Sequence, residues 1–239
     1  MLIQPTVDRL RALRLPAMSD TYLTQRQDQA VLAMDFDSRL ALLVDAEILA
    51  RENRKLARYL KDAKLRVAQA CLEDLDYAPG RHLDRPLIRQ LATGDVITGA
   101  TGVGKTYLAC ALGQQACRQS DRTLYRRLPR LFQELALARA DGSYATLLAR
   151  LARVDCLILD DWGLGTPNDL QRQDLLEVME DRDAARSTVI ASQLPQEHWH
   201  AYLGDPTVAD AVIDRLVNNA YTMHLKGPSR RKREDPKKA

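Results

Sequence analysis

The eight residues Gly99–Thr106 constrain the fold of this chain more than any other feature of its sequence. They read Gly-Ala-Thr-Gly-Val-Gly-Lys-Thr, they follow a short apolar run, and they open an amphipathic stretch that begins at Lys105. The pattern G-x-x-x-x-G-K-[ST] between a strand and a helix is typical of loops whose backbone N–H groups surround the phosphates of a nucleotide. Such a loop belongs to a parallel α/β sheet, so a purely helical or an all-β fold is excluded.

Residues 93–225 alternate short apolar runs with longer amphipathic stretches. This alternation predicts an α/β core, a parallel sheet with helices on both faces. The predicted strands are Val96–Thr98, Thr123–Tyr125, Cys156–Leu159, Thr188–Ala191 and Tyr221–Leu225. The predicted helices are Lys105–Arg118, Pro129–Ala140, Leu170–Arg182 and Thr207–Asn219.

The first part of the chain has a different pattern. From Thr6 to about Leu91 the apolar residues recur at helical spacing, and no stretch alternates with period two. Tyr77–Gly80 is a turn signal, and one more short helix is predicted over Pro86–Leu91. We therefore expect three parts: a small all-helical N-terminal domain over residues 1–92, the α/β core over 93–228 and a basic tail over 229–239.

Composition excludes several classes of protein. Of the 239 residues 46% are hydrophobic, which is enough for a packed core and excludes wholesale disorder. The longest uncharged run, Thr106–Cys117, has 12 residues, whereas a membrane-spanning helix needs about 20. The first residues lack the pattern of a secretory signal, and the four cysteines show no C-x-x-C pairing. We expect a cytoplasmic protein without a membrane anchor, a disulfide framework or a structural zinc.

The formal net charge of +3 hides an uneven distribution. Residues 1–92 carry a net charge of +2, residues 93–225 carry −4, and residues 226–239 carry +5. The segment Arg51–Arg66 holds seven cations against two acidic residues: Arg51, Arg54, Lys55, Arg58, Lys61, Lys64 and Arg66. On a helix such residues could contact DNA phosphates, or they could form a solvated face, and charge alone does not separate the two.

The motifs that carry chemistry lie in the α/β core. In the loop, Lys105 is expected to reach the β- and γ-phosphates of ATP, and the Thr106 hydroxyl to bind Mg²⁺. The full set of residues expected to bind the nucleotide is Gly99, Ala100, Thr101, Gly102, Val103, Gly104, Lys105, Thr106 and Tyr107.

Two further strands end in polar side chains. The apolar run Cys156–Leu159 leads into Asp160, the expected Mg²⁺ ligand, and Asp161, which would orient or deprotonate the attacking water. The run that begins at Thr188 leads into Ser192 and Gln193, either of which could contact the γ-phosphate or the water, with Gln193 preferred. An ordinary strand-to-turn exit explains the second pattern nearly as well.

Two arginine positions remain open on the residues alone. Arg215 lies on an otherwise apolar helix, where it could be an arginine finger for a neighbouring subunit or could form an ion pair with Asp214 or Asp210. The tail that begins at Ser229 could contribute an arginine that senses nucleotide, contact a phosphate backbone, or only increase solubility.

Together these features resemble the AAA+ ATPases, and more closely the insertion-sequence helper ATPases called IstB, which are related to the helicase loader DnaC. The combination of Leu-Asp-Asp-Trp-Gly (159–163) with Ser-Gln-Leu-Pro (192–195) and Trp-His (199–200) is specific to that family. The stretches that carry the resemblance are GATGVGKTYLACALG (99–113), ARADGSYATLLARLARVDCLILDDWG (138–163), LLEVMEDRDAARSTVIASQLPQEHWH (175–200), DPTVADAVIDRLVNNA (205–220) and LKGPSRRK (225–232), with LRLPAMSDTY (13–22) and LALLVDAEILARENRKL (40–56) in the helical part.

The resemblance implies roles for particular residues. Arg215 falls at the position of the arginine finger, Gln193 at the first sensor, and Arg231 at the second sensor, with Arg230 beside it. It also implies a five-stranded parallel sheet of order 5-1-4-3-2. Family members usually have more residues between Asp95 and the first strand, and that segment often lines the adenine pocket. Its absence here predicts impaired nucleotide binding or weak ATP hydrolysis.

The function implied is that of an ATP-dependent transposition helper. Such a protein would bind double-stranded DNA largely without sequence preference, form homo-oligomers on ATP and DNA, and recruit a cognate transposase, with hydrolysis as the switch. The alternatives are a DnaC-like loader of a replicative helicase and a nucleotide-binding module with little turnover. A small-molecule kinase would need an arginine-rich lid and an acceptor pocket, and the sequence shows neither.

Overall fold

A computed structural model of the chain describes residues 3–77, 83, 95–217 and 220–229. By its internal contacts the chain divides into two compact units, Met1–Arg58 and Tyr59–Ala239, which we call unit 1 and unit 2. The expected boundary after residue 92 therefore lies inside unit 2. The predicted helix Pro86–Leu91 and the residues Arg230 and Arg231 lie outside the described residues.

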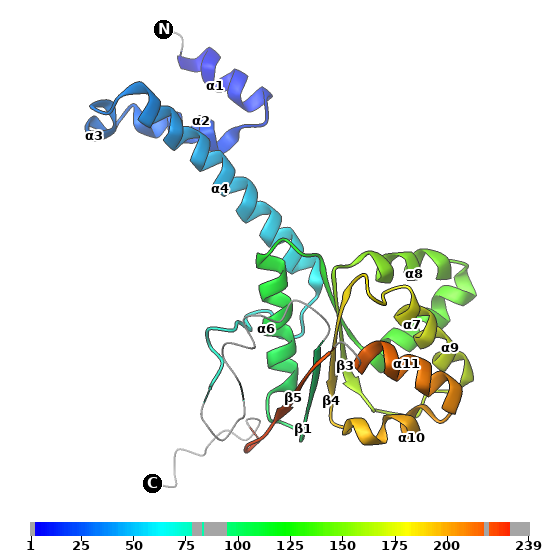
Figure 1. Ribbon diagram of the computed structural model, residues 1–239. Helices are drawn as coiled ribbons and strands as arrows, with labels where there is room; N and C mark the ends of the chain where they lie inside the picture. Colours follow the sequence, from blue (N-terminus) through cyan, green and yellow to red (C-terminus); the bar gives the residue numbers. More distant parts are fainter. Residues whose placement is uncertain (1–2, 78–82, 84–94, 218–219, 230–239) are drawn as a thin grey trace, which may run out of the picture. The chain divides into compact units, whose positions relative to one another are not determined.

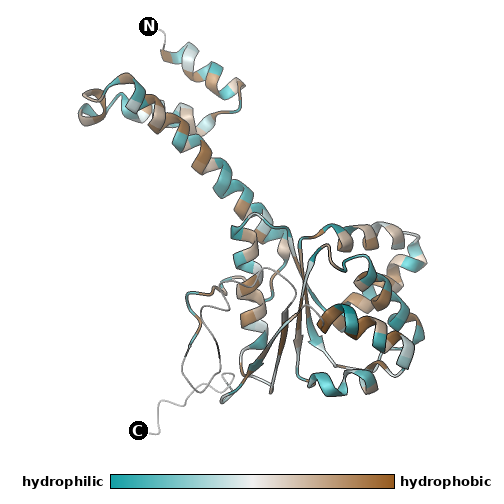
Figure 2. Cartoon of the chain, viewed as in Figure 1, coloured by the Kyte–Doolittle hydropathy of each residue, from teal (hydrophilic) through white to brown (hydrophobic). Residues whose placement is uncertain are grey.

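Unit 1 is helical, as predicted. It contains α1 (Ile3–Ala12), α2 (Pro16–Gln25), α3 (Gln29–Leu32) and most of α4 (Phe36–Ala63), whose last residues belong to unit 2. The Asp28 side chain caps α3 by accepting hydrogen bonds from the Ala30 and Val31 N–H groups. Figure 2 shows apolar residues interspersed with polar ones along these helices.

Glu47 is the polar centre of unit 1. Its carboxylate accepts hydrogen bonds from the backbone N–H groups of Ala17 at 2.9 Å and Met18 at 3.2 Å, so it caps the first turn of α2. The same carboxylate pairs with Arg51 at 3.0 Å and Arg54 at 3.2 Å. Two of the seven cations counted between Arg51 and Arg66 therefore have a structural role within this unit.

The sheet of unit 2 has five parallel strands in the order β2-β3-β4-β1-β5, which confirms the predicted order. The inner strand β1 pairs with β4 on one side and β5 on the other, so it forms a full part of the sheet although the segment before it is short. The strands are β1 (Asp95–Gly99), β2 (Thr123–Arg127), β3 (Cys156–Trp162), β4 (Ser187–Ser192) and β5 (Tyr221–Leu225).

Helices cover both faces of this sheet (Figure 1). On one face α6 packs with the segment 65–77 over Ile97, Ile158 and Ala191. On the other face, residues of the remaining helices pack over Val96, Leu157 and Leu159. The helices of unit 2 are α6 (Lys105–Arg118), α7 (Leu128–Asp141), α8 (Tyr144–Arg153), α9 (Asp169–Glu180), α10 (Trp199–Leu203) and α11 (Pro206–Val217), with a 3₁₀ turn over Gln196–His198.

Two expectations drawn from the sequence were wrong. The sequence pattern had not indicated every helix of unit 2, and it had indicated helix beyond the end of α4. It did not predict α8 or α10. It also extended the helical region too far, because α4 ends at Ala63 and no residue from 64 to 77 is helical. Lys64, with a φ of 52°, ends the helix in a left-handed conformation. Leu65, Val67 and other apolar residues of the following segment pack against the core of unit 2.

The described part of the chain also bears on two expected absences. None of its helices is long and apolar enough to cross a membrane. Nor do three or more His, Cys, Asp or Glu side chains gather there as a metal site.

Candidate nucleotide-binding site

The loop Gly99–Thr106 joins β1 to α6, as the motif predicted. Gly99 has a φ of 142°, and a Cβ placed there would lie 2.4 Å from the Leu225 carbonyl oxygen, so only glycine fits. Gly104, with a φ of 107°, is the N-cap of α6. Because it has no side chain to cap the helix, the first N–H groups of α6 are left to an external acceptor, and a phosphate suits them.

The Lys105 side chain lies over the loop and is buried. Its Nζ donates to the carbonyl oxygens of Gly99 at 2.6 Å and Ala100 at 2.8 Å. Val103 anchors the loop in the core with 1% of its surface exposed. The ammonium is thus held at the loop itself, at the position from which it would meet the β- and γ-phosphates.

Thr106 and Asp160 come together although they are far apart in the sequence. The Thr106 hydroxyl donates to Asp160 Oδ2 at 2.7 Å, and Tyr125 donates to the same oxygen at 2.7 Å. Asp160 Oδ1 accepts from the Asp161 N–H at 2.8 Å. Asp160 is buried, and its oxygen and that of Thr106 already lie in contact beside the loop. Hard oxygen donors in this arrangement fit Mg²⁺.

Asp161 has an unusual backbone. Its φ is 60°, in the left-handed region that non-glycine residues rarely adopt, and the pairing of β3 with β4 is irregular between Leu159 and Trp162. Its carboxylate accepts a hydrogen bond from Arg127 Nε at 2.5 Å and lies 3.9 Å from Arg66 Nη1. Both contacts are made by Asp161 Oδ2, so this oxygen faces two cations of the chain itself.

Three residues of this cluster were not predicted as site residues: Tyr125, Arg127 and Arg66. Arg127 ends β2 and is in register with Asp160, so the rule that parallel strands end at one edge could have found it. Tyr125 lies two residues earlier on the same strand, and burial followed by Asp160 raises its pKa, which keeps it a neutral donor. Arg66 was counted among the cations of a helix face, but it lies beyond the end of α4.

Gln193 and Ser192, the two alternatives at the end of β4, have different surroundings in the structure. The Thr101 hydroxyl donates to Gln193 Oε1 at 2.6 Å, so the Gln193 side chain reaches the phosphate loop. Ser192 is fully buried, and its hydroxyl bonds to the carbonyl oxygens of Trp162 and Leu194. Of the two, Gln193 is the one placed at the loop, while Ser192 stabilises the turn after β4.

A cavity of about 410 Å³ opens beside the loop, a size typical of small-molecule sites. Thr101, Lys105 and Asp160 line its polar part. The segment before β1 lines the rest, together with side chains of α6 and β5: Asp74, Leu75, Asp76, Leu83, Tyr107 and Leu225 are among the lining residues. Leu75, Leu83 and Leu225 give this part of the cavity an apolar surface, which suits a nucleobase.

The start of the basic tail also lies at this loop. A Cβ placed on Gly102 would lie 2.1 Å from Ser229 Oγ, so Ser229 lies directly over the loop. Arg231, predicted as the second sensor, follows two residues later but lies outside the described residues.

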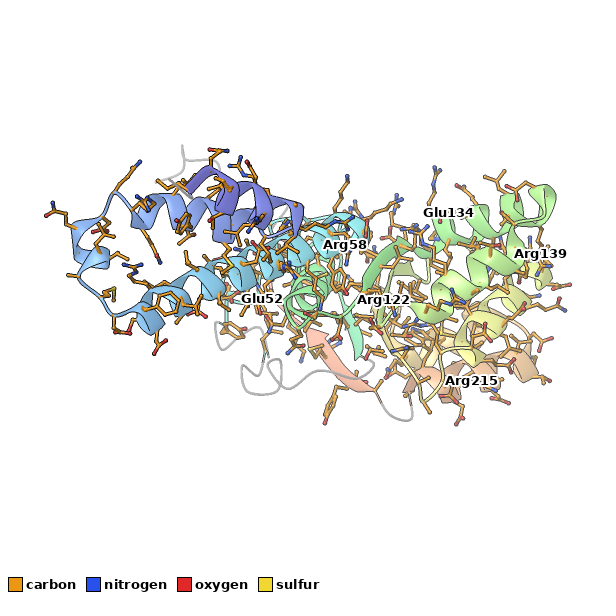
Figure 3. The ribbon with its side chains drawn as sticks, turned by 90° about the horizontal axis from the view of Figure 1, so that it is seen from above. Glu52, Arg58, Arg122, Glu134, Arg139 and Arg215 are labelled. Carbon is orange, nitrogen blue, oxygen red and sulfur yellow. The ribbon has the colours of Figure 1, made fainter. Side chains whose placement is uncertain are left out.

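Arg215 lies elsewhere in unit 2 (Figure 3). Its guanidinium donates to the Ala211 carbonyl at 2.8 Å and forms its ion pair with Glu180 at 3.0 Å, rather than with Asp214 or Asp210 as suggested above. It lines a hollow together with Asp121, Asp155 and Ser187. These three residues lie at the N-terminal ends of β2, β3 and β4. The phosphate loop lies at the opposite ends of the strands. Arg215 therefore does not complete the site of its own chain.

Comparison with known proteins agrees with this geometry. The family described as IstB-like ATP binding protein matches residues 8–238. An insertion sequence ATP-binding protein of Sinorhizobium fredii is 47% identical over 242 residues, which cover 98% of each chain. The ATP-binding protein of the insertion sequence IS1162 from Pseudomonas fluorescens is 49% identical over 203 residues, covering 82% of this chain and 88% of that protein.

Solved structures share the fold at low sequence identity. The crystal structure of DnaI has a TM-score of 0.60 at 21% identity, covering 71% of this chain and 94% of that one. DnaA from Aquifex aeolicus bound to AMPPCP has a TM-score of 0.56 at 18% identity, covering 66% and 50%. The family match covers nearly the whole chain and includes both the loop and Asp160, so this protein belongs to the family of IstB-like ATP binding proteins of insertion sequences.

Proposed function

We propose that this chain is an ATP-dependent DNA-binding helper of transposition, which binds and hydrolyses Mg²⁺-ATP and recruits a cognate transposase to DNA. The observation that carries the proposal is the convergence of Lys105, Thr106 and Asp160 on one loop, in a chain whose relatives are named insertion sequence ATP-binding proteins. Convergence of this kind supplies the donors for the phosphates and the ligands for the metal that transfer of a phosphoryl group to water requires.

Within the site each residue has a proposed task. Lys105 and the N–H groups of the loop bind the β- and γ-phosphates, and Thr106 with Asp160 holds Mg²⁺, which neutralises charge that develops on the phosphate oxygens. Asp161 orients the attacking water once it leaves Arg127, and Gln193 contacts the γ-phosphate or that water. Arg231 would meet the nucleotide from the tail, because Ser229 already lies on the loop.

Arg215 is proposed to act in a neighbouring subunit. Its distance from the loop of its own chain leaves it available for the site of a second copy, and its pairing with Glu180 fixes its position. An arginine supplied from a neighbour makes hydrolysis depend on assembly, which suits a protein that forms oligomers on DNA.

The proposed contacts with DNA are the cations of α4 and of the tail. Arg51 and Arg54 pair with Glu47, and the proposed contacts with DNA also include Lys55, Arg58, Lys61 and Lys64 farther along the chain. Arg58 and the acidic Glu52 on the same helix are labelled in Figure 3. Binding through phosphates would be largely independent of sequence and strongly dependent on salt.

A helicase loader is the main alternative, since DnaI and DnaC share the fold. Their identities of 21% show the fold alone, whereas relatives at 47% and 49% identity are named for insertion sequences, which favours the transposition helper.

The test is DNA strand transfer by the cognate transposase in the presence of this protein and ATP. We expect Lys105→Ala to remove the stimulation, because it removes the cation of the phosphate loop. Asp161→Asn should retain nucleotide binding and stimulation but fail to release the complex, because only hydrolysis is lost. Full stimulation by Lys105→Ala would contradict the proposal.

A further inference from the structure

Arg66 is a cation of the nucleotide site that comes from outside the motifs of the family. Its Nη1 lies 3.9 Å from Asp160 Oδ2 and 3.9 Å from Asp161 Oδ2, so one guanidinium pairs with both carboxylates. A hydrogen bond with Tyr125 is the main cause that raises the pKa of Arg66, and Tyr125 in turn donates to Asp160.

The backbone of Arg66 is fixed against α6. A Cβ placed on Gly113 of that helix would lie 3.1 Å from the Leu65 side chain, and the backbone of Arg66 and Val67 hydrogen-bonds to Cys110. Farther along, Arg118 of α6 pairs with Glu73 at 2.6 Å. The segment 65–77 thus lies along α6, with Arg66 directed at the carboxylates.

Asp160 Oδ2 is already crowded with donors. It accepts hydrogen bonds from Thr106 and Tyr125, and the Arg66 guanidinium lies next to it. A carboxylate oxygen that coordinates a metal must give up donors that occupy the same lone pairs, and a second cation next to the metal is repelled by it. Arg66 and Mg²⁺ therefore compete for the same oxygen.

We propose that Arg66 is a positioning residue that neutralises Asp160 and Asp161 before Mg²⁺-ATP binds and leaves them when the metal enters. Arg66 lies three residues after Ala63, the last residue of α4. The release of Arg66 therefore loosens residues 64–77, which follow α4. Binding of the metal thus changes the mobility of the chain directly after that helix. This inference rests on the proposed binding of Mg²⁺-ATP.

The test measures the concentration of free Mg²⁺ that half-saturates binding of a fluorescent ATP analogue to the full chain. Arg66→Gln should lower this concentration about two- to fivefold, the effect of losing a partly exposed ion pair. Arg66→Lys keeps the charge and should remain closer to the unchanged protein. The matched control is Arg118→Gln, which breaks another arginine contact between α6 and the same segment but touches neither carboxylate.

Four outcomes overturn the proposal. An unchanged Mg²⁺ requirement in Arg66→Gln means that Arg66 is only structural, and a higher requirement means that it helps to bind the metal or the nucleotide. An equal decrease in Arg118→Gln means that any loosening of the segment has the same effect. If the unchanged protein shows no saturable binding at any Mg²⁺ concentration, both the proposed function and this inference fail. Equal half-saturating Mg²⁺ concentrations for Arg66→Gln and the unchanged protein overturn the inference alone.

Hydrogen–deuterium exchange gives a second readout that does not depend on a variant's folding. In the unchanged protein, Mg²⁺ with ATP should increase exchange within residues 64–77, because Arg66 is released. ATP with EDTA should not. Equal exchange in the two conditions would contradict the proposed release.

Discussion

The two units use their apolar residues in opposite ways. In unit 2 two continuous clusters, one on each face of the sheet, bury most of the large apolar side chains. In the described residues of unit 1 only Val7 is a buried apolar residue, whereas nine of the chain's thirteen exposed large apolar residues lie there, among them Phe36, Ile48 and Leu49. Unit 2 is thus stabilised by its own core, and unit 1 presents surface that is suited to partners.

The difference also extends to charge. In unit 2 two of the buried charges, Lys105 and Asp160, lie at the phosphate loop and are held there by hydrogen bonds. In unit 1 the buried charge Glu47 caps a helix and pairs with two arginines. Unit 2 therefore brings part of its buried charge to a site suited to chemistry, whereas unit 1 uses Glu47 for structure. The following predictions test this contrast from the largest expected effect to the smallest.

The largest effect is expected for Arg215→Ala. It should lower the rate of ATP hydrolysis about 1000-fold while leaving nucleotide affinity unchanged, because an arginine finger stabilises only the transition state. Mixing this variant with Lys105→Ala should restore part of the rate, since intact sites can form between the two kinds of subunit. A rate that stays at the variant's level on mixing would contradict action in a neighbouring subunit.

Lys105→Ala should weaken ATP binding about 10- to 100-fold, the effect of losing charge-assisted hydrogen bonds to phosphate. Titration calorimetry measures the affinity. Because the Lys105 ammonium donates to carbonyl oxygens of the loop in unit 2, the circular dichroism of the helices should not change. A loss of helical signal would show that the substitution also disturbs the helices, so that its effect is not confined to the phosphate loop.

Arg58→Ala should weaken DNA binding about two- to fivefold and make the plot of log affinity against log salt shallower by about 0.9, the contribution of one phosphate contact. Arg51→Ala is the matched control on the same helix. Its guanidinium is held by Glu47 and the Arg14 carbonyl, so we expect lower thermal stability but an unchanged salt dependence. Equal salt slopes for both variants would refute the assignment of separate roles.

The smallest effect is expected for Leu49→Ser in unit 1. Leu49 is 59% exposed, so its replacement should change the free energy of unfolding by less than about 0.5 kcal/mol. Leu157→Ala in the buried centre of β3 should cost about 2–5 kcal/mol. Urea denaturation measures both, and a comparable loss for the two variants would contradict the description of unit 1.

Much of unit 2 could be predicted because its signals are local. The motif at Gly99–Thr106 requires a strand before it and a helix after it, and the helix Lys105–Arg118 and the strand Tyr221–Leu225 have the predicted ends. Helix α8 was missed, although its buried residues Leu148 and Leu151 have helical spacing, a signal that was available. Asp160, Lys105 and Thr106 lie together as the motifs predicted.

The segment 64–77 shows what could not be predicted. Its apolar residues continue the pattern of α4, but they pack on α6 in a path of turns and bends, because tertiary contacts with the sheet outweigh local helical preference. The pairing of Arg66 with Asp160 and Asp161 follows from that path. Charge counting placed Arg66 on a helix face, and only the folded chain shows that it reaches these two carboxylates.

The central claim is that ATP bound in unit 2 controls the interaction of the protein with DNA. The most direct test is the fluorescence anisotropy of a labelled DNA duplex titrated with the protein, with Mg²⁺-ATP or without nucleotide. We predict tighter binding with Mg²⁺-ATP and no nucleotide effect in Lys105→Ala. Equal affinity with and without ATP in the unchanged protein, or a full ATP effect in Lys105→Ala, would contradict the claim.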